Sequence, residues 1–278
     1  MRLWDAILLG FVQGVTEFLP VSSSGHLSIL QNFFHTQGTE QGHFFFDVLL
    51  HLGTLISVCL AYRAEVVDVV REVIGWFRKP VSEAQKPKDP MATRRLILMV
   101  VMATLPLFIV VFYNNAVEPL YYSTVFIGIA LILTGFMLYV ADRMIPGRKN
   151  EKTMRVRDAL IVGVCQAIAV IPGLSRSGTT ITAGIATGLN REFAVKYSFL
   201  LSIPAVLGAT VLTLADAIRE GINFALLPTY LVGMVVAGVS GYFSISLIRR
   251  IAKKSGFGGG AYYCWIVGVV TVFISILL

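Results

Sequence analysis

The chain alternates between long apolar segments and short polar connections. Six segments have about the 20 residues that a membrane-crossing helix needs: residues 44–62, 95–113, 122–142, 194–216, 228–249 and 260–278. A weakly apolar stretch, 64–77, predicts a helix at the membrane interface. This pattern predicts an all-α polytopic membrane protein with six transmembrane helices.

Four shorter apolar pieces form two interrupted pairs. Residues 3–19 and 25–34 are separated by Pro20, and residues 159–171 and 178–189 are separated by Pro172. Proline cannot continue the helical hydrogen-bond ladder, and it disfavours helix in the residue before it. We therefore expect two re-entrant helix hairpins. Their turns should lie near mid-membrane, where non-helical backbone is tolerated only inside protein or beside a polar cavity.

An internal duplication relates the two pairs at an offset of 153 residues. The offset aligns Arg2, Asp5, Ala6, Gly10 and Gln13 with Arg155, Asp158, Ala159, Gly163 and Gln166, and Ser22, Ser24 and Gly25 with Ser175, Ser177 and Gly178. We expect repeats over residues 1–142 and 154–278 within a single integral-membrane domain, 1–278. Three spans follow each hairpin, so the hairpins should enter from opposite faces. Such inverted-topology repeats place a site where the broken helices meet.

Composition excludes several classes of protein. Hydrophobic residues make up 56% of the chain and charged residues only 14%, against about 25% charged in soluble domains. A soluble enzyme, a secreted disulfide scaffold and a disordered chain are therefore excluded. The three cysteines lie in apolar segments and form no metal or disulfide pattern.

The net charge of +7 indicates topology rather than nucleic-acid binding. Most Lys and Arg residues lie in the connections 63–95, 143–157 and 249–254. The excess of basic residues in cytoplasmic loops predicts that these connections face the cytoplasm. Both termini, and the opening of the site, are then expected on the outer side, and we expect no nucleic-acid partner.

Serine-rich turns begin the second helix of each hairpin. Helix N-termini offer free N–H groups and a positive dipole end, which favour an anion, and Arg176 adds a cation to an otherwise apolar stretch. The serines could instead only cap helices, but the buried arginine favours a site for a phosphate-bearing group. The candidate binding residues are Gln13, Ser22, Ser24, Gly25, Ser175, Ser177, Gly178 and Thr179.

Reactive groups are concentrated in the first repeat. Ser23 and His26 share a helical face, and Glu17 precedes them, which is typical of a nucleophile with its base and orienting carboxylate. His26 could instead be a structural histidine. Asp47 and His51 could support the site or form an interfacial polar stripe. Glu17 could also bind a divalent cation such as Mg²⁺ or Ca²⁺ together with a substrate phosphate.

These residues resemble the signatures of a known family. The segments Gln13 to His26 and Pro172 to Gly178 are similar to the two signatures of the undecaprenyl-diphosphate phosphatases of the bacitracin-resistance type. Phe46 to Ser57 and Tyr197 to Pro204 also fit, so the resemblance spans essentially the whole chain. Gln13 is a departure, because many members have glutamate there.

The resemblance implies a hydrolase of the bacterial plasma membrane. It would convert undecaprenyl diphosphate to undecaprenyl phosphate and inorganic phosphate, recycling the lipid carrier of cell-wall synthesis and conferring bacitracin resistance. Its active site would comprise Gln13, Glu17, Ser23, His26 and Arg176. Glutamine cannot act as a base, so Glu17 would carry any carboxylate role alone. Either Ser23, His26 or water could attack the phosphorus, and His26 could accept the serine proton or protonate the leaving group.

Two other classes of function remain open on the sequence. Inverted repeats with re-entrant hairpins also suit a transporter or lipid flippase, and a structural membrane scaffold would need no reactive groups. Gly233, Gly238 and Gly241 would permit close helix approach, either within one subunit or in a homodimer.

Overall fold

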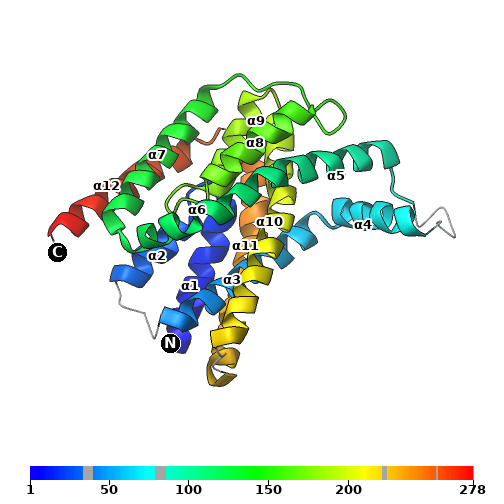
Figure 1. Cartoon of the computed structure of the whole chain (residues 1–278). Coiled ribbons are helices and arrows are strands. Elements are labelled where there is room, and N and C mark those ends of the chain that lie inside the picture. The colour runs from blue at the N-terminus through cyan, green and yellow to red at the C-terminus, as the bar shows by residue number, and fades with distance from the viewer. Residues whose placement is uncertain (34–39, 79–85, 221–223, 255, 278) are drawn as a thin grey trace.

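The computed structural model describes residues 1–33, 40–78, 86–220, 224–254 and 256–277 (Figure 1). Regular structure in these ranges is helical, apart from one isolated bridge between Lys149 and Leu189. The α-helices are α1 (Leu3–Phe18), α2 (Ser23–Phe33), α3 (Glu40–Ala61), α4 (Arg63–Phe77), α5 (Pro90–Thr104), α6 (Val110–Val117), α7 (Thr124–Arg143), α8 (Val156–Ile168), α9 (Arg176–Ala186), α10 (Arg191–Glu220), α11 (Leu227–Lys254) and α12 (Gly258–Leu277). Short 3₁₀ helices are η2 (Leu105–Ile109), η3 (Glu118–Tyr122) and η4 (Phe224–Leu226).

Several of these helices can cross a membrane. Within the described ranges, five segments are long and apolar enough: Pro90–Ile109, Thr124–Arg143, Arg191–Val211, Leu227–Lys253 and Gly258–Leu277. A sixth crossing is obtained if the bent pair Phe45–Ala61 and Arg63–Phe77, which meet at 90°, counts as one span. The chain is therefore a multi-pass, all-helical membrane protein, as the hydropathy pattern predicts.

The expected continuous span over residues 95–113 is wrong in detail. α5 ends at Thr104, the 3₁₀ helix η2 follows, and α6 begins at Val110. Pro106 lies at the start of η2 and has no N–H to continue the α-helical ladder. Hydropathy did not reveal this interruption, because Pro106 changes the backbone conformation without adding a polar or charged residue to the apolar segment.

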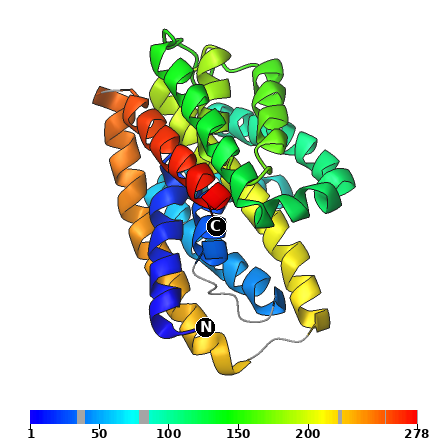
Figure 2. The ribbon, with the colours of Figure 1, turned by 90° about the vertical axis from the view of Figure 1, so that its left-hand side faces the viewer.

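Close helix pairs form the frame around the two broken segments. In both views α12 runs beside α7, and α1 runs beside α11 (Figures 1 and 2). Glycine permits the second contact, because a Cβ atom added at Gly10 would collide with the backbone of Gly233, and one at Gly14 with Ser240 and Ala237. These contacts fix the position of α1, and therefore of the turn that follows it, relative to α11.

The candidate dimer glycines are used inside the subunit. Gly233 faces Phe46, and a Cβ at Gly238 would lie 3.2 Å from the carbonyl oxygen of Gly53. Gly241 packs against Phe18 in the same way. Their small size is thus explained by packing within one chain.

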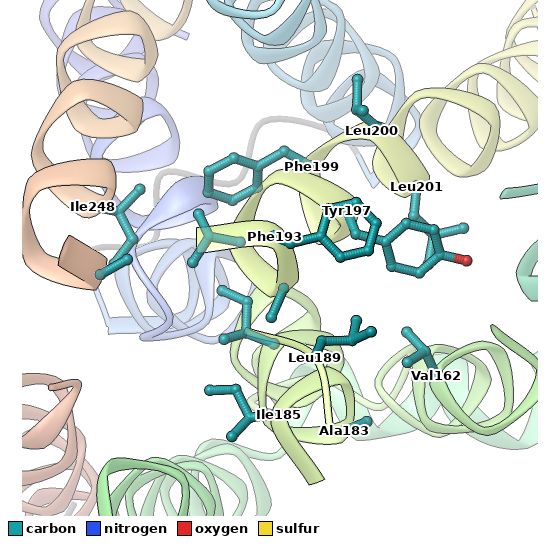
Figure 3. Close-up of a cluster of buried hydrophobic side chains, with 14 of the residues drawn as sticks. Val162, Ala183, Ile185, Leu189, Phe193, Tyr197, Phe199, Leu200, Leu201 and Ile248 are labelled. Atoms are coloured by element: carbon teal, nitrogen blue, oxygen red, sulfur yellow. The ribbon is translucent and has the colours of Figure 1, made fainter. Parts of the chain in front are cut away.

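The largest hydrophobic core surrounds the first half of α10 (Figure 3). Phe199 and Leu201 are fully buried there, and the Tyr197 hydroxyl donates to the carbonyl oxygen of Met99 at 2.6 Å. α10 also holds α9, because the hydroxyls of Thr180 and Ser198 lie 2.6 Å apart in a buried hydrogen bond. This core therefore fixes the helix that begins with Arg176.

Candidate active site

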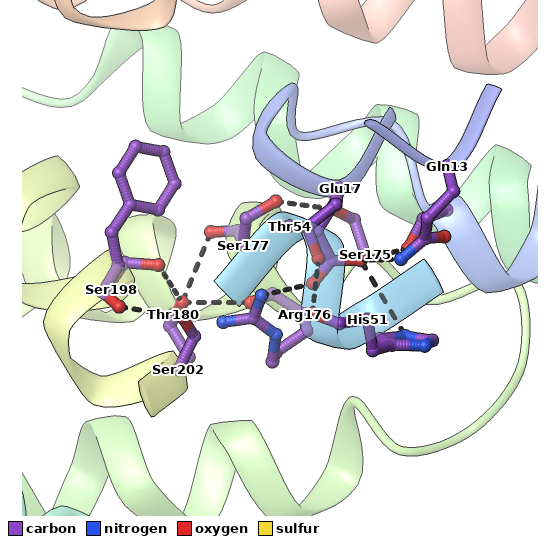
Figure 4. Close-up of polar contacts among 12 residues, drawn as sticks. Gln13, Glu17, His51, Thr54, Ser175, Arg176, Ser177, Thr180, Ser198 and Ser202 are labelled. Atoms are coloured by element: carbon purple, nitrogen blue, oxygen red, sulfur yellow. Dashed lines mark hydrogen bonds and ion pairs between the residues drawn. The ribbon is translucent and has the colours of Figure 1, made fainter. Parts of the chain in front are cut away.

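The carboxylate of Glu17, near the end of α1, joins the two broken segments (Figure 4). Ser23 Oγ donates a hydrogen bond to Glu17 Oε2 at 2.5 Å, and Arg176 Nη2 donates to Glu17 Oε1 at 2.6 Å. Gln13 Nε2, one turn earlier on α1, also donates to Oε2 at 3.1 Å, and His51 Nε2 of α3 lies 3.9 Å from it. Glu17 is only 6% exposed, so its charge is balanced by this set of donors.

A strained turn presents Ser23. α1 ends before Pro20, and Ser22 adopts a φ of +72°, the left-handed region that is costly for residues other than glycine. Ser22 Oγ accepts a hydrogen bond from the backbone N–H of Gly25 at 3.2 Å and so caps α2. Strained backbone of this kind occurs at functional sites. Ser23, at the first residue of α2, is held by it beside Glu17.

The second turn is built on a cap and on α7. Ser175 Oγ accepts from the N–H of Gly178 at 3.0 Å and caps α9. Thr134 of α7 accepts from the N–H of Ser175 and donates to the carbonyl oxygen of Gly173, both at 3.1 Å. Gly173 has a φ of +89°, which suits glycine. This turn places Arg176, the first residue of α9, within hydrogen-bond distance of Glu17.

The two turns touch one another. Ser177 Oγ donates to the carbonyl oxygen of Leu19 at 3.4 Å. A Cβ atom added at Gly178 would lie 3.3 Å from the carbonyl oxygen of Pro20. One added at Gly25 would lie 3.1 Å from Gly173 Cα. The starts of α2 and α9 therefore converge.

His26 occupies a different place from the one expected for a base of Ser23. Its Nδ1 lies 2.7 Å from the carbonyl oxygen of Ser22, and its Nε2 lies 2.8 Å from the hydroxyl of Tyr263 on α12. Among the described residues, His26 makes no hydrogen bond with Ser23 or Glu17. The Nδ1 atom of the His26 imidazole is hydrogen-bonded to the Ser22 carbonyl within the turn, and it is therefore not available to Ser23. The hydrogen-bond partner of Ser23 is the Glu17 carboxylate instead.

Other candidate residues lie in supporting positions. Ser24 Oγ is 3.4 Å from Ser22 Oγ, and Ser177 Oγ is 3.3 Å from Ser175 Oγ. Thr179, which the sequence offset of 153 residues aligns with His26, donates to the sulfur of Met137 at 3.9 Å. Within the described ranges, these hydroxyls make no hydrogen bond with Glu17.

Two buried polar atoms next to Glu17 have no hydrogen-bond partner among the residues that the structure describes. They are Arg176 Nη1 and Gln13 Oε1. A buried unpaired polar atom costs about 1–3 kcal/mol, so each is suited to a ligand. The guanidinium N–H can donate to an oxyanion, and the amide oxygen can accept from a hydroxyl or contact a cation.

The donor set fits a cation shared with a phosphate. The described residues contain no cluster of three or more His, Cys, Asp and Glu side chains that could hold a metal ion, so an all-protein cage does not fit. Glu17 and the free Gln13 Oε1 supply two oxygen donors. Mg²⁺ commonly takes one or two carboxylates and completes its shell with phosphate and water.

Sequence reasoning missed Tyr263 and Thr134. Both lie within apolar spans, where a hydroxyl is a common packing residue and no local pattern marks it. His51 was an open alternative, and its 3.9 Å distance to Glu17 places it beside the site. Asp47, one turn earlier, accepts from Gln31 at 3.2 Å.

Comparisons with known proteins show the family of the chain. The model of the family "Bacitracin resistance protein BacA" matches residues 6–270. A protein of Carboxydothermus hydrogenoformans named undecaprenyl-diphosphatase is 39% identical over 97% of this chain and 96% of its own length. Proteins of the same name from Methanosphaera stadtmanae and Methanobrevibacter smithii are 37% and 40% identical, covering 100% and 99% of both chains respectively.

Proposed function

Because the chain belongs to the family of the bacitracin resistance protein BacA, we propose that it is an undecaprenyl-diphosphatase. It hydrolyses undecaprenyl diphosphate to undecaprenyl phosphate and inorganic phosphate, and so returns the lipid carrier to cell-wall synthesis and confers bacitracin resistance. Full-length relatives that bear this name support the assignment.

The observation that carries the proposal is the bridge made by Glu17. One buried carboxylate binds a serine hydroxyl from the first turn and a guanidinium from the second. The Ser23 hydroxyl, as nucleophile, and the Arg176 guanidinium, as phosphate-binding group, are thereby held within reach of one phosphoryl group. Phosphoryl transfer needs mainly positioning and charge stabilisation, and this arrangement supplies both.

The terminal phosphate binds to Arg176 Nη1 and to backbone N–H groups at the starts of α2 and α9. Ser23 Oγ attacks the terminal phosphorus, forming the Oγ–P bond. The bond from that phosphorus to the bridging oxygen breaks, and undecaprenyl phosphate leaves. The Ser23 proton passes to Glu17 Oε2 and then to solvent. Water hydrolyses the phosphoserine, which regenerates the serine hydroxyl and releases inorganic phosphate.

We propose that the site takes a divalent cation, Mg²⁺ or Ca²⁺, together with the substrate. When bound, such a cation would neutralise charge on the diphosphate. Glu17 and Gln13 Oε1 would hold it from the protein side, while Arg176 balances the remaining phosphate charge. Because the site offers a single carboxylate, we expect the cation to bind only together with substrate oxygens.

Phosphate release from a long-chain prenyl diphosphate, measured with the purified protein in detergent, tests the assignment. Ser23→Ala and Arg176→Ala should each lower the rate by at least about 10²-fold, as for other groups that stabilise a transition state. Ser246→Ala and Arg250→Ala, near the C-terminal end of α11 and outside the two turns, are matched controls. If Ser23→Ala and Arg176→Ala hydrolyse as fast as the wild type, the assignment of the activity to these two turns is wrong. If lipid crosses vesicles without phosphate release, a transporter or flippase replaces this proposal.

We also infer that the chain is one domain of two inverted-topology repeats, 1–142 and 154–278, each opened by a re-entrant hairpin. Equivalent contacts support the duplication: the N–H of Arg2 binds Asp5 Oδ2 at 3.0 Å, and the N–H of Arg155 binds Asp158 Oδ2 at 2.9 Å. The protein lies in the plasma membrane with the site and both termini facing outward. The prenyl tail lies between spans, in contact with the bilayer.

A further inference from the structure

His26 makes two hydrogen bonds that fix its protonation pattern. A backbone carbonyl can only accept, so the Nδ1 atom that lies 2.7 Å from the Ser22 oxygen must carry a proton. In a neutral imidazole the other nitrogen is then an acceptor. The hydroxyl of Tyr263, 2.8 Å from Nε2, is therefore the donor.

Tyr263 also fixes the plane of the imidazole. The two rings are stacked with centroids 5.5 Å apart and an angle of 8° between their planes. Tyr263 belongs to α12, and α12 packs along α7, the helix whose Thr134 holds the second turn. One helix pair thus contacts both turns of the site.

We propose that Tyr263 is a positioning residue, which acts through His26 to hold the Ser22 carbonyl and thereby the strained turn that presents Ser23. The left-handed φ of Ser22 is unfavourable on its own, and the Nδ1–H bond to the same residue's carbonyl stabilises it. The chain of contacts runs from Tyr263 to His26, to Ser22 and to the neighbouring Ser23.

Substitution of the hydroxyl alone separates this role from packing. Tyr263→Phe keeps the ring stack and removes the donor, while Tyr262→Phe, on the adjacent residue that packs on Trp265, is the matched control. At metal sites, loss of the outer contact that orients a site residue commonly costs about 10–100-fold in affinity or activity. We expect kcat to fall about tenfold in Tyr263→Phe with KM little changed, because the nucleophile is misplaced while the phosphate contacts remain. Tyr262→Phe should match the wild type.

A double variant tests whether Tyr263 acts through His26. In a His26→Ala background, Tyr263→Phe should cause no further loss, because the intermediate link is already absent. An independent further loss, or an unchanged kcat in the single variant, would overturn the proposal.

Because this role rests on the proposed phosphatase activity, nitrogen-15 NMR of the histidine rings supplies a readout without substrate. His26, assigned by its loss in His26→Ala, should show a protonated Nδ1 and a hydrogen-bonded acceptor at Nε2 in the wild type. Tyr263→Phe should move the Nε2 resonance toward that of a free acceptor. A wild-type Nε2 that carries the proton, or one unaffected by Tyr263→Phe, refutes the positioning role. A wild-type protein that releases no phosphate refutes the proposed function, while the ring resonances still report on this contact.

Discussion

Ser22 combines local strain with a capping role. Its φ of +72° places a non-glycine residue in the left-handed region, yet its hydroxyl caps α2 and its carbonyl binds His26. The corresponding cap in the second turn, Ser175, has a φ of −73° and no such strain. The two turns therefore use the same type of cap with different backbone conformations.

This difference predicts unequal responses to glycine. Alanine at either cap should lower the free energy of unfolding by about 1 kcal/mol, because the capping oxygen is lost. Glycine at residue 22 also removes a strain of about 1–2 kcal/mol. The gap in stability between Ser22→Gly and Ser22→Ala should therefore exceed the gap between Ser175→Gly and Ser175→Ala by about 1 kcal/mol. Reversible denaturation in detergent measures both gaps, and equal gaps would contradict the strain argument.

Gln13 offers a direct test of the cation proposal. Gln13→Glu places a second carboxylate four residues from Glu17 on the same face of α1, where the two negative charges repel unless a cation lies between them. The Mg²⁺ concentration that gives half-maximal phosphate release should fall about tenfold, which corresponds to roughly 1.4 kcal/mol.

The matched control is Gln31→Glu. Gln31 donates to the Asp47 carboxylate at 3.2 Å, so the substitution also sets two carboxylates together, but away from the two turns. Its cation dependence should equal that of the wild type. An unchanged or weaker dependence in Gln13→Glu would remove Glu17 and Gln13 as cation ligands.

At the scale of elements, proline and hydropathy predicted most of the helices. Pro20 and Pro172 follow the ends of α1 and α8 as expected, whereas the 3₁₀ segment at Pro106 was hidden in a continuous apolar run. Pro204, by contrast, lies inside α10, and the helix continues through it. Whether a proline ends a helix depends on what packs around it, and the sequence does not contain that information locally.

The candidate site was predictable only where the residues lie near the two turns. The internal offset brought Ser23 and Arg176 to equivalent positions, and the structure holds both on Glu17. The contact between His26 and Tyr263 spans 237 residues. It depends on how α12 packs on α7, and adjacent Tyr262 carries the same sequence signal.

The contact between α1 and α11 gives a prediction about packing. Gly14→Ala would drive a methyl group into Ser240 and the backbone of α11. The substitution should lower the free energy of unfolding by about 1–3 kcal/mol. It should also displace Glu17, which lies on the same helix. Gly75→Ala on α4 is the control, since a Cβ there meets nothing within 4 Å. Alanine's higher helix propensity should leave that variant equal or slightly more stable. Thermal unfolding of the two variants in detergent would compare them, and equal stability would mean that α1 can move away from α11.

For the whole molecule, the position of the site between two broken segments matters more than any single helix. Glu17 is reached from the first turn by Ser23 and from the second by Arg176, so neither half of the chain holds the arrangement alone. α7 contacts α2 and α9 and pairs with α12, which ties the halves together around the site. Separate expression of the two halves would therefore lose the bridge on which the proposed activity depends.

The proposed orientation of the molecule rests on its charged connections, and labelling can test it. Cys59, Cys165 and Cys264 are free, so a background lacking them is needed. In it, Ala225→Cys between α10 and α11 should react with an impermeant maleimide in intact cells, and Arg148→Cys between α7 and α8 only after lysis. Both residues are exposed, so a difference reports sidedness rather than burial. The opposite pattern would turn the site toward the cytoplasm, because basic connections are the reason for placing residues 143–157 inside.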